Sequence, residues 1–217
     1  MGKVQIGILD GFIGKVGTVV GSYWKGKPVM RAWKRSISDQ NNEAQQLVRT
    51  RFAAIGQLAG AFIYAIRIGF KQYARSKQMT EGDVFVKLNW SCIHAEAPGH
   101  AEIDFGDLVC AKGNLPEAGF GTLSFATPLT VSCPLTDTSE QIGADSHDLV
   151  YMFVYNPTKK AGVLGDTKVR PDESIACEVP AYWNGDRVHV YGFAVGAGPN
   201  NKGNISNSRY LGQGTIA

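Results

Sequence analysis

Apolar residues are spaced differently in three successive parts of the chain. Residues 1–35 alternate glycines with β-branched residues, residues 42–76 place apolar side chains three or four positions apart, and from Thr80 onward the interval is two. Intervals of three and four are typical of a helix, and an interval of two is typical of a strand. The chain is therefore predicted to be α+β and mostly β, with a β-arm or hairpin, a long or broken helix and then a β domain.

The first part predicts short strands or an extended arm, with a turn at 25–28 between strands at 16–24 and 29–33. Five glycines lie between Gly7 and Gly21, both included. Because glycine loses more backbone entropy on folding than other residues do, an isolated hairpin here is weak. The segment is thus expected to need a partner surface, either on its own β domain or on another copy.

The second part predicts a helix over 42–76 that is buried on most sides. Residues 52–66 contain one strongly polar residue, Gln57, and a helix that is apolar nearly all round is typical of a core. A continuous helix of this length spans about 50 Å, which is long for a domain of this size. It is expected to break into two helices at Gly56, Gly60 or Gly69, or to pack in part against another protomer.

The third part predicts short strands separated by turns rich in Gly, Pro and Asn. The expected strands cover residues 84–92, 101–105, 108–111, 122–125, 129–132, 148–155, 162–164, 174–179, 187–195 and 207–211. Short strands at this spacing favour an immunoglobulin/fibronectin-like β-sandwich. The predicted domains are 1–78, a basic arm and helix, and 79–217, an all-β sandwich-like domain.

The net charge changes sign at the same predicted domain boundary. Residues 1–78 hold thirteen Lys and Arg against three Asp and Glu, a net charge of +10, whereas the remainder holds nine against sixteen, a net charge of −7. Such a chain can match its two halves internally, pack head to tail with copies of itself, or bind nucleic acid or another polyanion. The sequence leaves these three interpretations open.

The four cysteines, Cys92, Cys110, Cys133 and Cys177, are far apart and lie in or near apolar segments. Free buried thiols are the preferred interpretation, with two disulfides as the alternative in an oxidising compartment. The N-terminus lacks the continuous apolar segment of a secretory signal, and no run reaches the roughly 18 apolar residues of a membrane span. We therefore expect no signal peptide, no membrane span, and a location in the cytoplasm or within a virion-like assembly.

Several motifs resemble those of an uncharacterised family that is abundant in Bacteroidota. They are GILDGFIGKVGTVVGSYWKG at 7–26, EAQ at 43–45, RFA at 51–53, IGFK at 68–71, KGNLP at 112–116, VYNP at 154–157, PAYWNGD at 180–186 and SNSRYLG at 206–212. The family usually has Gly where this chain has Asp10. The resemblance covers nearly the whole chain and implies that the glycine-rich start and the β-rich end form one unit, but it implies no catalytic residues.

Motifs for catalysis and cofactor binding are not matched. The glycines at 14–17 and 119–121 lack the lysine–serine ending of a phosphate-binding loop, and no Gly-x-Ser-x-Gly is present. Cys92, His94 and His100 are interpreted as a chance cluster, because no second close pair completes a metal site. The other candidates are interpreted as core, solvated or turn residues: Asp104, Asp107, His147, Asp172, Glu173 and His189. We expect no enzyme activity, no cofactor and no metal.

The preferred hypothesis is a non-enzymatic structural protein that self-assembles through its arm and helix, such as a subunit of a phage-like particle or filament. Its apolar groups exceed what one small sandwich can cover. Its partners are then copies of itself or other subunits of an assembly. The residues expected at the interface are Gly14, Gly17, Val19, Trp24, Trp33, Phe52, Ile55, Phe62 and Ile66.

Two alternatives remain. A nucleic-acid-associated protein would use aromatic residues interleaved with cations to stack bases and neutralise phosphates; its expected contacts are Lys25, Lys27, Arg31, Lys34 and Arg35, near Tyr23, Trp24 and Trp33. A ligand- or glycan-binding sandwich would use Trp183 and the loop at 196–204, on fold analogy.

Overall fold

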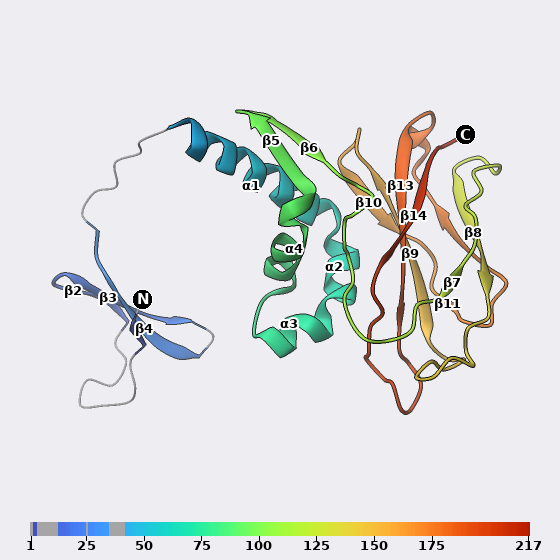
Figure 1. The fold of residues 1–217 in the computed structure, drawn as a ribbon, viewed down its shortest axis with the longest axis horizontal. Coiled ribbons are helices and arrows are strands. Elements are labelled where there is room, and N and C mark those ends of the chain that lie inside the picture. The colour runs from blue at the N-terminus through green and yellow to red at the C-terminus, as the bar shows by residue number, and fades with distance from the viewer. Residues whose placement is uncertain (1, 4–12, 25, 35–41) are drawn as a thin grey trace. The chain divides into compact units, whose positions relative to one another are not determined.

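A computed structural model describes residues 2–3, 13–24, 26–34 and 42–217. The chain forms two compact units, residues 1–42 (unit 1) and residues 43–217 (unit 2). Unit 1 is a four-stranded antiparallel sheet in the order β1-β4-β3-β2 (Figure 1). Its strands are β1 (Gly2–Lys3), β2 (Gly14–Val16), β3 (Val19–Trp24) and β4 (Lys27–Ala32). The predicted hairpin is confirmed as β3 and β4, and Lys25 of its turn lies outside the described residues.

The predicted helix is broken into three pieces. They are α1 (Glu43–Ala61), α2 (Ile63–Gly69) and α3 (Lys71–Lys77), and α2 is bent by 80° from α1. Gly69 lies at the second break, where an added Cβ would come within 2.3 Å of the Cys110 carbonyl oxygen. Gly56 and Gly60 lie inside α1, so these two glycines do not break the helix.

The prediction of a strand at 84–92 is wrong. The chain there forms α4 (Glu81–Asn89), followed by the short 3₁₀ helix η1 (Trp90–Cys92). A capping box starts α4: the Thr80 hydroxyl accepts a bond from the Asp83 N–H, and the Asp83 carboxylate accepts one from the Thr80 N–H. This cap satisfies backbone donors at the helix start, and it outweighs the strand preference of the β-branched residues.

Two further predicted strands, at 108–111 and 122–125, are not strands in unit 2. At 108–111 side chains take the backbone bonds that a sheet would use. The Asn89 Oδ1 accepts from the Val109 N–H at 2.7 Å, and the Ser208 hydroxyl accepts from the Cys110 N–H at 2.9 Å. Residues 122–125 retain one isolated bridge, Ser124 to Ser132.

The remaining strands of unit 2 form antiparallel sheets. The main sheet has the order β10-β9-β13-β14, with β11 also pairing with β9; a smaller sheet has the order β12-β8-β7, and β5 and β6 form a hairpin. Their bounds are β5 (Ile93–Ala97), β6 (His100–Ile103), β7 (Gly119–Phe120), β8 (Thr130–Thr136), β9 (Leu149–Asn156), β10 (Ala161–Leu164), β11 (Lys168–Val169), β12 (Ser174–Glu178), β13 (Arg187–Val195) and β14 (Arg209–Thr215), with a 3₁₀ turn, η2 (Ala181–Trp183), before β13. The fold is α+β, with more strand than helix.

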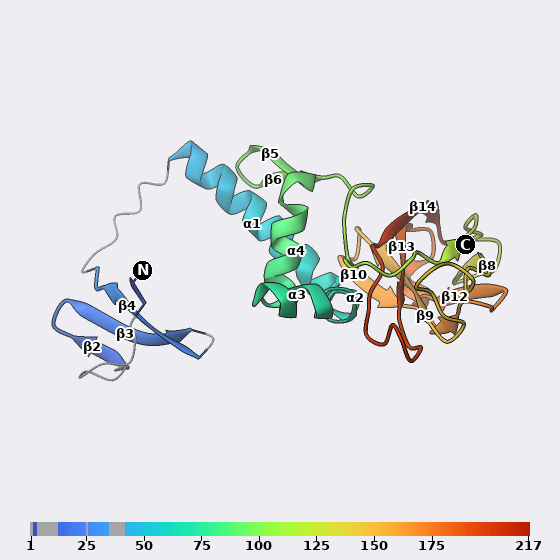
Figure 2. The same cartoon turned by 60° about the horizontal axis from the view of Figure 1, so that its bottom comes forward.

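The main sheet of unit 2 is covered on both faces, because alternate residues of β9 enter different cores. Phe153 and Tyr155 pack into the core that contains the helices, whereas Val150, Met152 and Val154 pack into the core shared with β8 and β12. Figures 1 and 2 show the helices on one side of this sheet and the smaller sheet on the other. Unit 2 therefore has three layers: helices, main sheet and smaller sheet.

Within the described residues, no single helix is long and apolar enough to cross a membrane. The bent pair α1 and α2 meets the same length and composition test together. Its central side chains, such as Ile55 and Phe62, are fully buried in unit 2.

Candidate functional site

The strand register sorts the side chains of unit 1 onto two faces, because directly opposed residues of antiparallel strands share a face. One face, which we call the uncharged face, consists among the described residues of Gly14, Val16, Val19, Gly21, Tyr23, Pro28, Met30 and Ala32. The other, the basic face, consists of Lys15, Val20, Ser22, Trp24, Lys27, Val29 and Arg31. Every described Lys and Arg of β2, β3 and β4 lies on the basic face.

The uncharged face is open over much of its area. Val16 is 64% exposed and Tyr23 is 48% exposed, and Val19 is half-buried. Gly17, in the turn between β2 and β3, has φ +58°, and Gly14 has φ +111°. Glycine adopts these positive φ values without the strain of a Cβ, so Gly14 and Gly17 allow the backbone to take this shape. Val19, the next predicted interface residue, lies on the uncharged face.

On the basic face, Lys15, Lys27 and Arg31 are exposed, and Trp24 is 58% exposed. The Lys15 Nζ lies 3.2 Å from the centre of the Trp33 ring, a cation–π contact. Lys34 is exposed just after β4. The structure thus brings Lys27 and Arg31 onto one face with Trp24, and the remaining predicted contacts, Lys25 and Arg35, lie outside the described residues.

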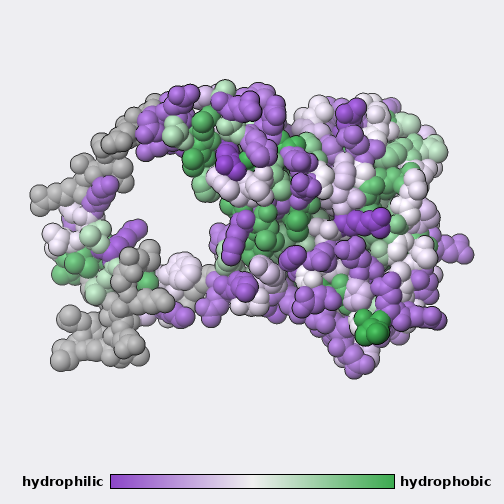
Figure 3. Space-filling view, in the orientation of Figure 1, coloured by the Kyte–Doolittle hydropathy of each residue, from purple (hydrophilic) through white to green (hydrophobic). Residues whose placement is uncertain are grey.

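A second open surface runs along α1. Val48 and Phe52 are 47% and 55% exposed, and four-residue spacing continues this line to Gly56 and Gly60, where a Cβ would meet nothing within 4 Å. We call these four residues the α1 stripe. Figure 3 shows hydrophobic surface over this helix. Phe52 also contacts Trp90, with ring centres 4.7 Å apart.

Three other residues predicted at the interface lie inside unit 2 instead. Ile55, Phe62 and Ile66 are at most 1% exposed. The Phe62 ring lies 4.6 Å from Phe153 and 5.0 Å from Tyr155, between centres. These three side chains join α1 and α2 to the main sheet of the same chain, so the exposed contacts of the helix come from the α1 stripe.

Sequence reasoning missed a groove of about 590 Å³ in unit 2, between α1, the β5–β6 hairpin and the end of β9. Its floor is apolar and includes Leu58, Ile103 and Tyr155, and its lining also includes Arg49, Gln57 and Lys160. Burial raises the pKa of Tyr155 to about 12, so this phenol stays neutral near pH 7. The groove is lined by segments that lie far apart in the sequence, so no local pattern predicts it.

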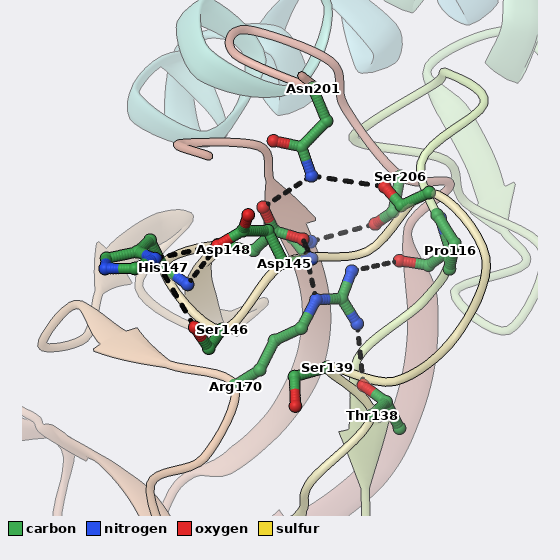
Figure 4. A network of polar contacts seen from close by, with 12 residues as sticks. Pro116, Thr138, Ser139, Asp145, Ser146, His147, Asp148, Arg170, Asn201 and Ser206 are labelled. Atoms are coloured by element: carbon green, nitrogen blue, oxygen red, sulfur yellow. Dashed lines mark hydrogen bonds and ion pairs between the residues drawn. The ribbon is translucent and has the colours of Figure 1, made fainter. Parts of the chain in front are cut away.

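Sequence reasoning also missed a buried ion pair that ties the loops of unit 2 together (Figure 4). The Arg170 Nε donates to the Asp148 carboxylate at 2.8 Å, and both side chains have no exposed area. The guanidinium also donates to the Pro116 and Glu117 carbonyls and the Thr138 hydroxyl, and the other Asp148 oxygen accepts from Asn201. Because each charged group of the pair has several hydrogen-bond partners, the network has a structural role.

Ser146, His147 and Asp145 lie together in Figure 4 without the geometry of a catalytic triad. Both the Ser146 hydroxyl and the Asp145 carboxylate contact the same ring nitrogen of His147, at 3.3 and 2.8 Å, whereas a triad uses opposite nitrogens. The Asp145 carboxylate also accepts the His147 N–H, which lowers the pKa of Asp145. The cluster is a local turn.

Burial accounts for the four cysteines and for His189 of unit 2. All four cysteines are free and buried, as the preferred interpretation predicts, and burial raises the pKa of Cys110 and of Cys177 to about 12. His189 stacks on Phe105 at 4.1 Å and contacts the Tyr210 hydroxyl at 2.9 Å. In the part of the chain that the structure describes, no group of three or more His, Cys, Asp and Glu residues could hold a metal ion.

The protein thus consists of two units, a sheet with one uncharged and one basic face and a three-layer α+β unit. Its sequence matches the model for a family of unknown function (DUF6266) over residues 11–212. The chain belongs to this family, which confirms the expectation of a family of unknown function. No curated protein and no solved structure matches it.

Proposed function

We propose that this protein is a non-enzymatic structural subunit that self-assembles through the uncharged face of unit 1 and the α1 stripe. One observation carries the proposal: the described part of unit 1 has one buried apolar side chain, Val29. Below about 70 residues a single core rarely supplies more than 3–5 kcal/mol. Val29 lies on the basic face, so the uncharged face has no buried apolar side chain among the described residues, and covering that face would add stability.

The composition of the uncharged face favours a second copy as its cover. A symmetric dimer brings the same face of each subunit together, and a face without charges meets its own copy without repulsion. Two sheets stack about 10 Å apart, and Gly14, where an added Cβ would meet nothing within 4 Å, leaves room for a facing side chain. A particle or filament is the assembly that a second interface on the same chain would produce.

The α1 stripe supports that second interface. Glycine inside a helix destabilises it by about 0.5–1 kcal/mol relative to alanine. Gly56 and Gly60 touch nothing that would require a glycine within the described chain. They leave a flat track beside Val48 and Phe52, along which another backbone can approach closely.

The finer architecture is part of the proposal. We assign the main and smaller sheets to an immunoglobulin- or fibronectin-like sandwich that forms the exposed body of the subunit. Its support is the face-to-face core between them, where Val131 and Ile175 of the smaller sheet meet Val150 and Val190 of the main sheet.

The test measures the molar mass of the full chain by light scattering, over a range of concentrations at low salt. The double variant Val16→Lys/Tyr23→Lys places charge on the uncharged face and is expected to weaken association at least about 100-fold, because two lysines must then be desolvated. The matched control is Ile142→Lys/Tyr182→Lys, which makes the same changes at residues of unit 2 that are 99% and 65% exposed. The control should associate as the unchanged protein does.

A second arm tests the α1 stripe with Gly56→Ala/Gly60→Ala. Each alanine should stabilise the monomer by about 0.5–1 kcal/mol, while the two methyl groups obstruct the close approach and weaken assembly. A full chain that stays monomeric at high concentration sinks the proposal.

A further inference from the structure

We propose that the basic face of unit 1 binds single-stranded nucleic acid, with Trp24 stacking on a base and Lys15, Lys27 and Arg31 contacting phosphates. This function goes beyond self-assembly and uses the opposite side of the same sheet. The sheet would then present one face to its own copies and the other to a polyanion.

The strand register gives the patch its shape. Lys15, Val20 and Arg31 form one row across β2, β3 and β4, and Trp24 opposes Lys27 four residues further along β3. Strands are about 4.8 Å apart and rise about 3.3 Å per residue, so the patch is about 10 Å wide and 13 Å long. At a rise of about 3.4 Å per nucleotide, that length suits about four stacked nucleotides.

The charge around this patch is of one sign. β2, β3 and β4 contain no Asp or Glu, so a phosphate backbone meets no repulsion from these strands. Residues 1–42 hold seven Lys and Arg against two Asp, a net charge of +5, and this charge extends the attraction beyond the patch. An anionic chain is therefore the ligand class that the face fits.

The indole decides between anionic ligands. Proteins that hold single strands combine cations that follow the backbone with aromatic rings on which bases stack, and Trp24 is 58% exposed beside Lys27. The contact of Lys15 with Trp33 shows that cation and indole already lie together on this unit. Stacking on an indole is tolerant of sequence because every base has a π-face, so binding should tolerate many sequences.

The experiment titrates fluorescently labelled 12-nucleotide oligo-dT and oligo-U with the full chain, by anisotropy, at several salt concentrations. Each neutralised phosphate contributes about −0.7 to the slope of log affinity against log salt for single strands. Lys15→Gln/Lys27→Gln/Arg31→Gln should therefore make the slope about 2 less steep. The matched control, Lys87→Gln/Lys112→Gln/Lys202→Gln, removes the same charge from exposed residues of unit 2 and should leave the slope unchanged.

Trp24→Ala should lower affinity by roughly 5- to 150-fold without changing the salt slope, because it removes stacking and no charge. Absence of binding at low salt overturns the proposal, as does equal loss in the unit 2 control. Competition by polyglutamate as effective as by an oligonucleotide of equal charge overturns it in favour of an acidic protein partner. If the unchanged chain binds no oligonucleotide and the triple variant loses self-association, the basic face binds another copy of the chain instead.

Discussion

Two antiparallel sheets of this chain differ in what covers their faces. In the main sheet of unit 2, β9 and β13 are buried on both sides, one core holding Phe153 and the other Val154. In the sheet of unit 1, β3 and β4 have comparable lengths, yet Gly21 and Val29 are their only buried residues. The first sheet finds its cover within the chain, whereas in the second Val16, Tyr23 and Trp24 keep about half or more of their area exposed. We propose that the functions lie on its two chemically distinct faces.

The largest effect should come from breaking the buried ion pair of unit 2. Asp148→Ala leaves the Arg170 charge buried without its partner, so we expect a loss of about 5 kcal/mol of unfolding free energy, at the upper end for such pairs. Urea denaturation followed by tryptophan fluorescence measures it. Glu140→Ala, which removes an exposed carboxylate from the loop between β8 and β9, should have a small effect, and equal losses would contradict the structural role of the network.

A direct comparison of the two sheets comes from truncating one aromatic residue in each. Phe62→Ala removes a ring that contacts Phe85, Phe153, Tyr155 and Tyr191, and we expect a loss of about 4 kcal/mol from unit 2. Tyr23→Ala, on the uncharged face of unit 1, should leave the unfolding free energy of unit 2 unchanged and weaken self-association. Urea denaturation at high and at low protein concentration separates loss of stability from loss of self-association. A large loss of unfolding free energy from Tyr23→Ala would contradict the proposed difference between the two sheets.

A smaller effect should appear at alkaline pH and in unit 2 alone, because all four cysteines belong to it. Burial raises the pKa of Cys110 and Cys177 to about 12 in the folded chain, while an unfolded thiol titrates near 8.5. Stability is therefore fully present below pH 8.5 and is lost as the pH rises toward 12. By pH 9.5 we expect a loss of about 3 kcal/mol of unfolding free energy for the two thiols together.

Urea midpoints measured from pH 8 to 10 check this slope. Cys110→Ala/Cys177→Ala lowers stability at every pH, since it opens cavities, but it should flatten the pH dependence. A slope unchanged in that variant would assign the alkaline loss to other groups.

Local pattern predicted much of the fold. The strand at 187–195 is β13 with the same bounds, and those at 148–155 and 174–179 agree with β9 and β12 within a residue or so, because the interval of two is strong there. It failed at α4, where the sequence Val84–Phe85–Val86 favours a strand but the Thr80–Asp83 cap and burial of Val84 and Phe85 favour a helix. Single-residue preferences are weak against a cap and a core.

The candidate site divides in the same way. The mixture of cations and indoles at 15–35 is visible in the sequence, and so is the excess of glycine. Their separation onto two faces is not, because it depends on a register in which Lys15 opposes Val20 and Val20 opposes Arg31. A shift of one residue would exchange the faces of every side chain. Likewise, the apolar spacing predicted a buried helix, but only packing against Phe153 and Tyr155 decided that Phe62 and Ile66 belong to the chain's own core.

By itself, the sequence determined the α+β class, the position of most strands and the division of charge, since these follow from local spacing and composition. The tertiary structure decided which surfaces are buried within the chain and which remain exposed. Burial and facing depend on contacts between residues far apart, such as Phe62 with Tyr191 and Asp148 with Arg170, and no local pattern encodes such partners.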